Sequence, residues 1–564
     1  MGYIEEIADF ASSLQLNVIP LDVLDRLRAQ RRSVLASIAS SYNDDSARVV
    51  LDAVSSWAST GPAPLVFTER KVRVDDALVA ASAFSMALDF DDYLSFAHPG
   101  HSAVLVPLLL ASETGAGADV QLLAQLIADE VEARLGAACI LGPLNGQLWS
   151  FVHAAGAAAA AAKVLGLNKE RTAHALAIAL YQPPRPSIPG FISSGTKVLT
   201  AVEGIISGLR AARLAAKGMI GPLDILDTPD GLLSSFSYAP FHAALGGLGE
   251  YWLTRTLAIK PLPGCAYLTS VIESLLSLGP LDPSTISSIA VDASIFTCAM
   301  DTMTIVEPRI AASATSTSRT TTRSTIAGPR IRARAKSLFS KHVHRARHSY
   351  HALSPVIVGF SVPWSVAVTI VASSFDPDVL QNSWLADHAE QLGALADKVV
   401  LRHDWRMTSQ AIGASLMNLP PLGSLLSEVG PYQMLKGLLK VKTDHPTTAC
   451  TNLHPDIIKD LAIFLIDKER PRITTALPTP ARRFRTAMVF PAEVTIQFHN
   501  GRRVSAREQV NTGSPDHPDI SKRPEQVSQE KLARFGPMGW GETRTALIAK
   551  AIAEDDDNLF DLIS

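Results

Sequence analysis

Apolar residues recur with a period of three to four along almost the whole of residues 1–260. Near the N-terminus Ile4, Ile7 and Leu14 fall on one face at this spacing, which is the pattern of an amphipathic helix packed on a core. The last segment, residues 519–564, returns to the same pattern. We therefore predict an all-helical bundle domain that is built from both ends of the chain.

A run of small residues marks one helix of this bundle. Residues 153–167 (HAAGAAAAAAKVLGL) are dominated by alanine, whose small side chain favours helix and lets neighbouring helices approach closely. We predict a central helix here, with Gly166 as its C-terminal stop.

The pattern changes after residue 260 to one that includes strands. Residues 286–297 and 492–504 are rich in β-branched and aromatic residues, which is typical of strands. In the second segment Asn500 and Gly501 lie between alternating apolar and polar residues, which favours a hairpin with a type I′ turn.

These patterns together predict a mainly α protein with a smaller α+β second domain. The predicted helical domain takes residues 1–264 and 518–564, and an α+β lid domain takes residues 265–517. Within the lid, residues 354–375 carry no charge and are just long enough to span a bilayer. Prolines interrupt this stretch and serines dilute it, so we predict a buried core helix and no membrane partner.

The composition fits such a protein and excludes several classes of partner. Of the 564 residues 47% are hydrophobic and 19% are charged, and the formal net charge is −3, so nothing indicates a nucleic-acid partner. The N-terminus has no secretory signal pattern. The four cysteines have neither zinc nor disulfide spacing, so we expect a cytoplasmic protein. They are Cys139, Cys265, Cys298 and Cys450.

A basic insertion interrupts the predicted lid near residues 308–351. It has no acidic residue and is rich in Ser, Thr and Arg. Three interpretations stay open: a loop that binds an anion or a partner, a disordered surface insertion, or a stretch of untranslated sequence retained in the gene product.

The segment LDFDDYLSFAHPGHSA holds most of the candidate chemistry. Asp89, Asp91 and Asp92 lie within four residues, and His98 and His101 follow at a Pro-Gly turn. On a helix Asp89 and Asp92 would share a face and Asp91 would point elsewhere. A carboxylate pair near imidazoles suits acid–base chemistry, because repulsion and hydrogen bonding adjust the pKa values. The same pattern is also typical of a solvated helix end.

The DFDD motif followed by HPG resembles the signature of the MmgE/PrpD family, which includes 2-methylcitrate dehydratases and cis-aconitate decarboxylases. Six further segments are similar to that family in the same order along the chain. They are residues 156–167, 195–197, 259–265, 360–367, 395–404 and 494–505. The resemblance implies a helical domain made from both chain ends, an α+β lid and usually a homodimer. It also implies an active site in the cleft between the domains that needs no metal or organic cofactor.

The resemblance implies four catalytic candidates. The first acid of DFDD is Asp89, and the lysine of the family's Thr-Lys segment is Lys197. The family's active-site histidine is either His98 or His101, and the HSA context of His101 is similar to fungal cis-aconitate decarboxylases.

Three positions depart from the family pattern and are candidates for substrate binding. Tyr93 stands where threonine is usual, and Gln147 and Thr269 stand where the family has histidines. Because glutamine and threonine do not transfer protons near neutral pH, two expected acid–base groups are missing.

We therefore predict a cofactor-independent lyase that acts on a small citrate-like tricarboxylic acid. The reaction is either dehydration of a 2-methylcitrate or alkylcitrate type of substrate or decarboxylation of cis-aconitate, and the residues do not separate the two. The altered positions leave two alternatives open: a repurposed member of the family, such as an isomerase, an epimerase or another catalyst of secondary metabolism, and a non-catalytic relative.

Overall fold

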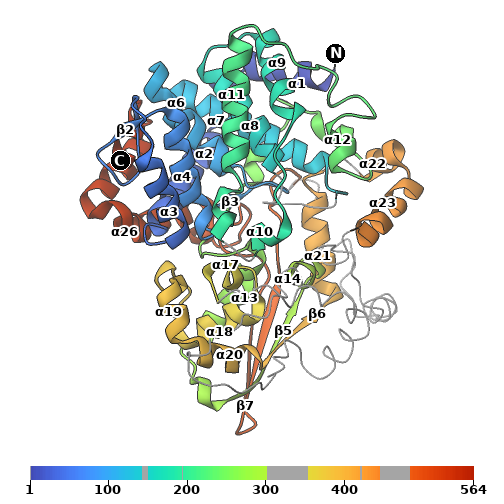
Figure 1. Ribbon diagram of the computed structural model, residues 1–564. Coiled ribbons are helices and arrows are strands. Elements are labelled where there is room, and N and C mark those ends of the chain that lie inside the picture. The colour runs from blue at the N-terminus through green and yellow to red at the C-terminus, as the bar shows by residue number, and fades with distance from the viewer. Residues whose placement is uncertain (1, 143–149, 193–194, 302–352, 420–421, 445–482) are drawn as a thin grey trace, which may run out of the picture.

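The computed structural model describes residues 2–142, 150–192, 195–301, 353–419, 422–444 and 483–564. A large helical part lies above a smaller part that holds the main sheet, and the two ends of the chain both belong to the helical part (Figure 1). The predicted mainly α fold with an α+β second part is confirmed. Gln147 and the basic insertion near residues 308–351 lie outside the described residues.

The helical part is a bundle of long helices joined by short elements. Its long helices are α1 (Tyr3–Ser13), α2 (Leu21–Ser40), α3 (Asp45–Ser56), α4 (Val74–Ala87), α6 (Leu105–Thr114), α7 (Ala118–Ala138), α8 (Ser150–Val164), α9 (Lys169–Tyr181), α11 (Val202–Ala216) and α26 (Pro524–Ala553). Its short elements are β1 (Ala63–Pro64), β2 (Lys71–Val72), β3 (Asp92–Tyr93), α5 (Gly100–Ala103), α10 (Ile188–Ile192), η3 (Gly195–Leu199), α12 (Leu232–Phe236) and β4 (Ala258–Ile259). The C-terminal helix α26 packs along α2, so the last part of the chain lies against one of its first helices.

Helix α8 is the predicted alanine-rich central helix. A Cβ added at Gly204 or Gly208 of α11 would lie 2.4 Å from the carbonyl oxygen of Ser150 or 2.3 Å from that of Ala154. The two helix backbones therefore touch, which larger side chains would prevent. Gly166 ends the helix with φ at +65°, a conformation that favours glycine.

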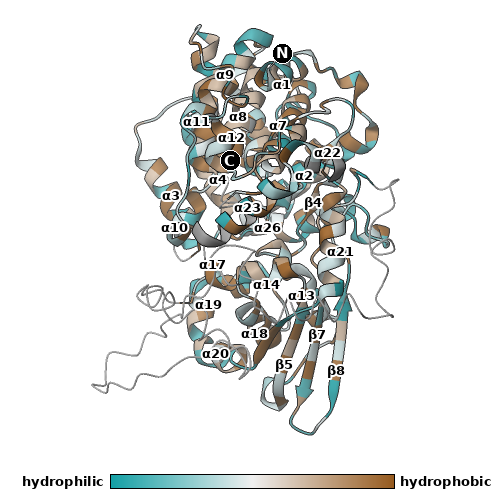
Figure 2. Cartoon of the chain, turned by 90° about the vertical axis from the view of Figure 1, so that its right-hand side faces the viewer, coloured by the Kyte–Doolittle hydropathy of each residue, from teal (hydrophilic) through white to brown (hydrophobic). Residues whose placement is uncertain are grey.

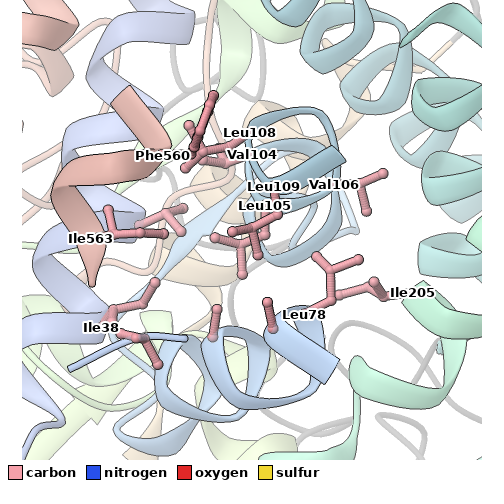
Figure 3. Close-up of a cluster of buried hydrophobic side chains, with 14 of the residues drawn as sticks. Ile38, Leu78, Val104, Leu105, Val106, Leu108, Leu109, Ile205, Phe560 and Ile563 are labelled. Atoms are coloured by element: carbon pink, nitrogen blue, oxygen red, sulfur yellow. The ribbon is translucent and has the colours of Figure 1, made fainter. Parts of the chain in front are cut away.

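Both ends of the chain share one apolar core with the helix that leads into the candidate motif. Ile38 of α2, Leu78 of α4 and Leu105 of α6 pack in the same buried cluster as Phe560 and Ile563 (Figure 3). Burial of this kind of side chain supplies most of the stability of a domain. It fixes the position of α4, and the DFDD motif follows directly after that helix.

The lid is a four-stranded sheet with helices packed against it. The strand order is β6-β5-β7-β8, with β5 and β6 parallel and the other pairs antiparallel. Figure 2 shows apolar residues concentrated on β5 and β7, whereas the edge strand β8 is mostly hydrophilic. The strands are β5 (Ile286–Ala293), β6 (Val399–His403), β7 (Ala492–Phe498) and β8 (Arg503–Glu508). The helices are α13 (Ala266–Leu276), α14 (Ile295–Asp301), α17 (Pro355–Val358), α18 (Val362–Ala372), α19 (Asn382–Asp387), α20 (Ala389–Ala396) and α21 (Trp405–Leu416). Two further helices, α22 (Leu422–Val429) and α23 (Pro431–Asp444), lie against the helical part, where the amide of His242 donates to Glu428 Oε1.

Two details of the predicted strands are wrong. The strand predicted over residues 286–297 stops at Ala293, level with the end of its parallel partner β6, and Ile295 already begins helix α14. The predicted hairpin is present, but its turn is not type I′. That turn needs two residues with positive φ, and of the two central residues only Gly501 has one, at +85°. The amide of Phe498 donates to the carbonyl of Arg502, which makes a three-residue loop.

The uncharged stretch over residues 354–375 forms two short buried helices of the lid core, α17 and α18. Both belong to the same buried cluster as α13 and β5, which agrees with the predicted core helix. Across the residues that the structure describes, no helix combines the length and the apolar character that crossing a membrane requires. The domain boundaries at residues 264 and 517 stay predictions.

Candidate active site

The DFDD motif is not helical, which corrects one prediction. Helix α4 ends at Ala87, and Asp89 takes a left-handed backbone conformation with φ at +54°. The chain then runs extended, and Asp92 pairs with Ile259 in the small sheet of β3 and β4. The carboxylates of Asp89 and Asp91 both face Lys260. The matching pair is therefore Asp89 and Asp91, and not the predicted pair of Asp89 and Asp92.

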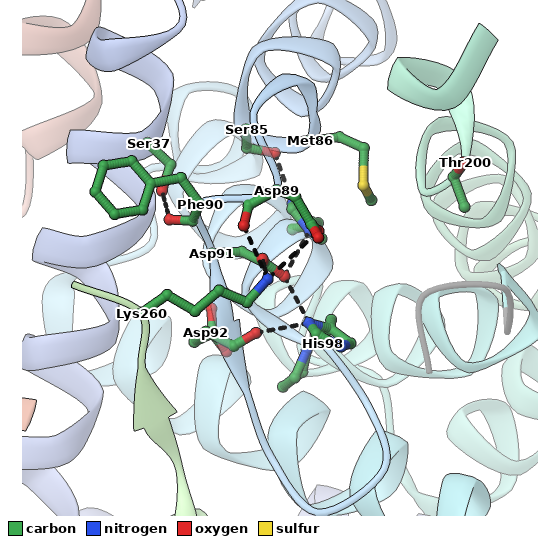
Figure 4. Close-up of polar contacts among 12 residues, drawn as sticks. Ser37, Ser85, Met86, Asp89, Phe90, Asp91, Asp92, His98, Thr200 and Lys260 are labelled. Carbon is green, nitrogen blue, oxygen red and sulfur yellow. Dashed lines mark hydrogen bonds and ion pairs between the residues drawn. The ribbon is translucent and has the colours of Figure 1, made fainter. Parts of the chain in front are cut away.

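Two lysines from distant segments meet these two carboxylates. Figure 4 shows one of them, Lys260, beside Asp89 and Asp91. Lys260 Nζ lies 2.5 Å from Asp91 Oδ1 and 3.3 Å from Asp89 Oδ1, and it donates to the backbone carbonyl of Asp89 at 2.9 Å. Lys197 Nζ lies 3.6 Å from the same oxygen of Asp89 and donates to the carbonyl of Met86 at 3.0 Å. All four charged side chains are at most 3% exposed.

This arrangement keeps Asp89, Asp91 and Lys260 charged despite their burial. Burial by itself would raise the pKa of Asp89, but Lys197 and Lys260 outweigh it and hold that pKa below its usual value. Burial acts in the same way on Asp91, and Lys260 with His98 holds the pKa of Asp91 well below its usual value. For Lys260, burial is outweighed by Asp89 and Asp91, which raise its pKa. Buried ions of opposite sign stabilise one another in this way only while the set is complete.

His98 contacts Asp91 through one ring nitrogen, Nδ1, and its other ring nitrogen, Nε2, is not used in this contact. Its Nδ1 lies 2.8 Å from Asp91 Oδ2 and 2.9 Å from the backbone oxygen of Asp92. Since a carbonyl oxygen only accepts hydrogen bonds, Nδ1 carries the hydrogen and Nε2 is the basic nitrogen. No group among the described residues hydrogen-bonds Nε2, and the His98 side chain is 11% exposed.

Both ring nitrogens of His101 have a partner. Its Nδ1 lies 2.8 Å from Ser85 Oγ, and its Nε2 lies 3.2 Å from Asp91 Oδ2. The side chain is completely buried, and burial lowers the pKa of His101 to about 4, although Asp91 opposes the shift. At neutral pH it is therefore an uncharged donor to Asp91.

Behind the motif lies a pair of buried acids that share one amide. Gln30 Nε2 donates to Asp92 Oδ2 and to Asp129 Oδ1, each at 2.9 Å. Burial, together with the charge of Asp91, raises the pKa of Asp92 to about 6. Burial and the neighbouring Asp92 raise the pKa of Asp129 well above its usual value. These acids differ from Asp89 and Asp91 because no lysine compensates their burial.

A second buried histidine adjoins the cluster from the central helix. His153 Nδ1 lies 2.8 Å from Ser102 Oγ and 3.2 Å from Glu132 Oε2, and its ring centre is 5.8 Å from that of His101. A Cβ on Gly156 would lie 1.8 Å from Glu132 Oε1, so glycine at this position makes room for the glutamate.

Comparison with known proteins relates the chain to a family. Residues 5–242 match the MmgE/PrpD N-terminal domain. That match relates this part of the chain to the MmgE/PrpD family. Cis-aconitate decarboxylase of Aspergillus terreus is 30% identical over 305 residues, which are 49% of this chain and 60% of that protein. The cis-aconitate decarboxylase-like protein oryM of Aspergillus oryzae is 26% identical over 306 residues, which are 48% of this chain and 61% of that protein. The chain thus spans about 60% of the length of these curated relatives.

The four catalytic candidates, Asp89, His98, His101 and Lys197, lie in one hydrogen-bonded and ion-paired cluster. The three substrate-binding candidates behave differently. Their positions are as follows: Tyr93 adjoins the cluster at the ring of His98, with ring centres 6.4 Å apart, Thr269 is buried within lid helix α13, and Gln147 is outside the described residues.

The hydroxyl of Tyr93 is already committed to other groups. It donates to the backbone oxygen of Met488 at 3.1 Å and accepts from Asn511 Nδ2 at 2.8 Å. Burial raises the pKa of Tyr93 to about 12, so it stays protonated. The longer side chain thus turns its hydroxyl toward residues 488 and 511, and its ring forms the wall beside His98.

Sequence reasoning missed the role of Lys260 and Asp91. Lys260 lies in one of the segments that carry the family resemblance, and a lysine inside the apolar run LAIKPLPGC is itself a signal, because a charge in a buried segment needs a partner. Helical periodicity does not select Asp91, whose carboxylate joins that of Asp89 only because the motif is not helical. Among the described residues no group of three or more His, Cys, Asp or Glu side chains is arranged to hold a metal ion.

Proposed function

We propose that this chain is a cofactor-independent lyase for a citrate-like tricarboxylic acid, and that its first candidate reaction is decarboxylation of cis-aconitate. The observation that carries the proposal is the buried cluster of two lysines, two carboxylates and a histidine held by Asp91. The similarity to two Aspergillus proteins named after cis-aconitate decarboxylase supports the choice of substrate.

Lys197 and Lys260 are the proposed clamps for substrate carboxylates. A buried ammonium group on each side of Asp89 offers fixed positive charge to an anion, and charge-assisted hydrogen bonds are stronger than neutral ones. Because the lysines are paired with Asp89 and Asp91 in the described arrangement, a substrate carboxylate has to replace Asp89 at one of them.

His98 is the proposed acid–base group. In decarboxylation the bond between the substrate and its carboxylate carbon breaks, carbon dioxide leaves, and the electron pair stays on the substrate carbon. A protonated Nε2 of His98 would then donate its proton to that carbon, while Asp91 holds Nδ1 in place. In dehydration a base would remove the proton next to a carboxylate, and His98 would protonate the departing hydroxyl. His101 would position Asp91 and would not meet the substrate.

The test is incubation of the purified full chain with cis-aconitate, 2-methylcitrate and citrate in separate reactions that are followed by mass spectrometry. We expect His98→Asn to lower the rate by roughly 10² to 10⁴, the usual cost of losing a general acid or base. His499→Asn is the matched control, because His499 is exposed on the lid hairpin. Release of carbon dioxide supports decarboxylation, and release of water supports dehydration. No turnover of any of the three acids by folded protein would reject the lyase proposal.

The second candidate is an isomerase or epimerase that keeps the same acid–base groups. The observation that favours it is the commitment of the Tyr93 hydroxyl to Asn511 and Met488, since the wall beside His98 then differs from the family pattern. A product of unchanged mass and altered configuration in the same incubations would support this candidate.

The homodimer stays a prediction from the family resemblance, and the cytoplasmic location stays a prediction from the cysteine pattern. Light scattering coupled to size-exclusion chromatography tests the oligomeric state directly.

A further inference from the structure

Three buried lysines from separate parts of the chain donate to the backbone of one turn. The turn is residues 86–90, which link helix α4 to the extended part of the motif. The contacts are Lys197 Nζ to the Met86 oxygen at 3.0 Å, Lys260 Nζ to the Asp89 oxygen at 2.9 Å, and Lys531 Nζ to the Phe90 oxygen. The first two lysines also face carboxylates of the candidate site. Lys531 belongs to helix α26 and is not used by the proposed mechanism.

The groups that hydrogen-bond Lys531 are uncharged. Its Nζ lies 2.9 Å from Ser33 Oγ and 3.1 Å from Ser37 Oγ, both on helix α2, and 3.7 Å from the centre of the Phe90 ring. Lys531 is 3% exposed. Burial lowers its pKa well below the ordinary value, and Asp91 opposes this only in part. A lysine placed in this way acts through hydrogen bonds and not as a counterion.

Phe90 has further contacts through its carbonyl oxygen and its ring. Ser37 Oγ also donates to its carbonyl oxygen, and its ring packs edge-to-face on Phe535 of α26 with centres 5.3 Å apart. The residue before it, Asp89, has its backbone in the left-handed region, which costs free energy for any residue other than glycine. Such a conformation persists only where the surroundings fix it firmly.

We propose that Lys531 is a positioning residue: by holding the carbonyl of Phe90 it keeps the carboxylates of Asp89 and Asp91 directed at Lys260. The C-terminal helix is then part of the candidate site. The positioning of the two carboxylates by Lys531 does not depend on the proposed function. The expected effect of Lys531 on turnover rests on the proposed function.

The test is hydrogen exchange measured by mass spectrometry on the full chain. Lys531→Met keeps the length of the side chain and removes its amine. Lys550→Met is the control on the same helix, because that side chain is 68% exposed. We expect Lys531→Met to speed exchange of the amides of residues 88–92 by about tenfold or more, while those of helix α8 keep the wild-type rate. Ser37→Ala removes the second donor to the same carbonyl and serves where Lys531→Met does not fold.

Equal exchange in Lys531→Met and Lys550→Met would overturn the proposal, and so would equal acceleration in α8, because the effect would then be general. With cis-aconitate as substrate, we expect Lys531→Met to lower kcat about tenfold with KM changed much less, since misdirected carboxylates affect the reaction more than binding. If the wild type does not turn over cis-aconitate, 2-methylcitrate or citrate, the proposed function fails, and the exchange result still decides the positioning role.

Discussion

Replacing Lys260 by methionine tests the electrostatic basis of the candidate site most directly. The change removes the ammonium group that lies 2.5 Å from Asp91 and 3.3 Å from Asp89. Two buried carboxylates then remain, with Lys197 at 3.6 Å from Asp89. Removing one partner from a buried ion pair typically costs about 3–5 kcal/mol, because a charge is left buried without compensation. For a cooperative unit of about 300 residues this corresponds to a fall in Tm of roughly 5–8 °C.

The size of the effect must depend on pH. In the wild type the pKa values of Asp89 and Asp91 are lowered by folding, so their stabilising contribution is present at neutral pH and is lost as the pH falls below about 4. Without Lys260, burial acts on Asp91 with less opposition and raises its pKa in the folded state. The cost of the substitution is then largest at neutral pH, and it shrinks as the pH falls toward the pKa of aspartate in the unfolded chain.

Scanning calorimetry of the wild type and of Lys260→Met at pH 7.5 and pH 5 measures both effects. Lys550→Met is the control for loss of a lysine from the surface. We expect the double variant Asp91→Asn with Lys260→Met to recover part of the lost Tm, because the buried charge without a partner is removed. A fall in Tm no larger than that of Lys550→Met would refute the reasoning, as would an equal fall at both pH values.

Two further substitutions test the buried acids Asp92 and Glu132, which lie next to the charged cluster. Asp92→Asn should raise the Tm at pH 8 but not at pH 4, because a folded pKa of about 6 means that ionising Asp92 opposes folding above that pH. Calorimetry at the two pH values measures this difference, and equal shifts in Tm would contradict the prediction. Gly156→Ala places a methyl group where Glu132 Oε1 lies 1.8 Å away, and it should cost about 1–3 kcal/mol by overpacking. Gly393→Ala is its control, since a Cβ there meets only Trp364, at 3.8 Å; similar unfolding of the two variants would contradict the steric argument.

The parts of the fold that local sequence decides could be predicted. The alanine run gave helix α8 and its glycine stop, because helix propensity and close packing act within a few turns. The β-branched segments located β5 and the hairpin of β7 and β8. The errors lie at ends and turns, such as the change from strand to helix at Ser294, where the partner strand β6 ends and nothing in residues 286–297 signals it.

The candidate site could be located from sequence, but its geometry could not. The motif identified Asp89, and the family resemblance identified Lys197. The directions of the carboxylates depend on the left-handed turn at Asp89, and that turn is held by lysines from three remote segments. A helical periodicity argument cannot include such contacts, and it therefore chose Asp92 in place of Asp91.

The positions that depart from the family pattern are not spread evenly over the site. The charged groups, Asp89, Asp91, Lys197 and Lys260 with His98, form a complete ion-paired set at the end of helix α4. The departures that the structure describes involve contacts to the lid, since the Tyr93 hydroxyl is bound by Met488 and Asn511 and Thr269 lies on α13. Loss of catalysis would remove the need to keep four charges buried together, because a buried ion pair is commonly replaceable by apolar residues without loss of stability. A retained charged set beside an altered wall therefore favours the proposed catalytic role over a protein that has left catalysis.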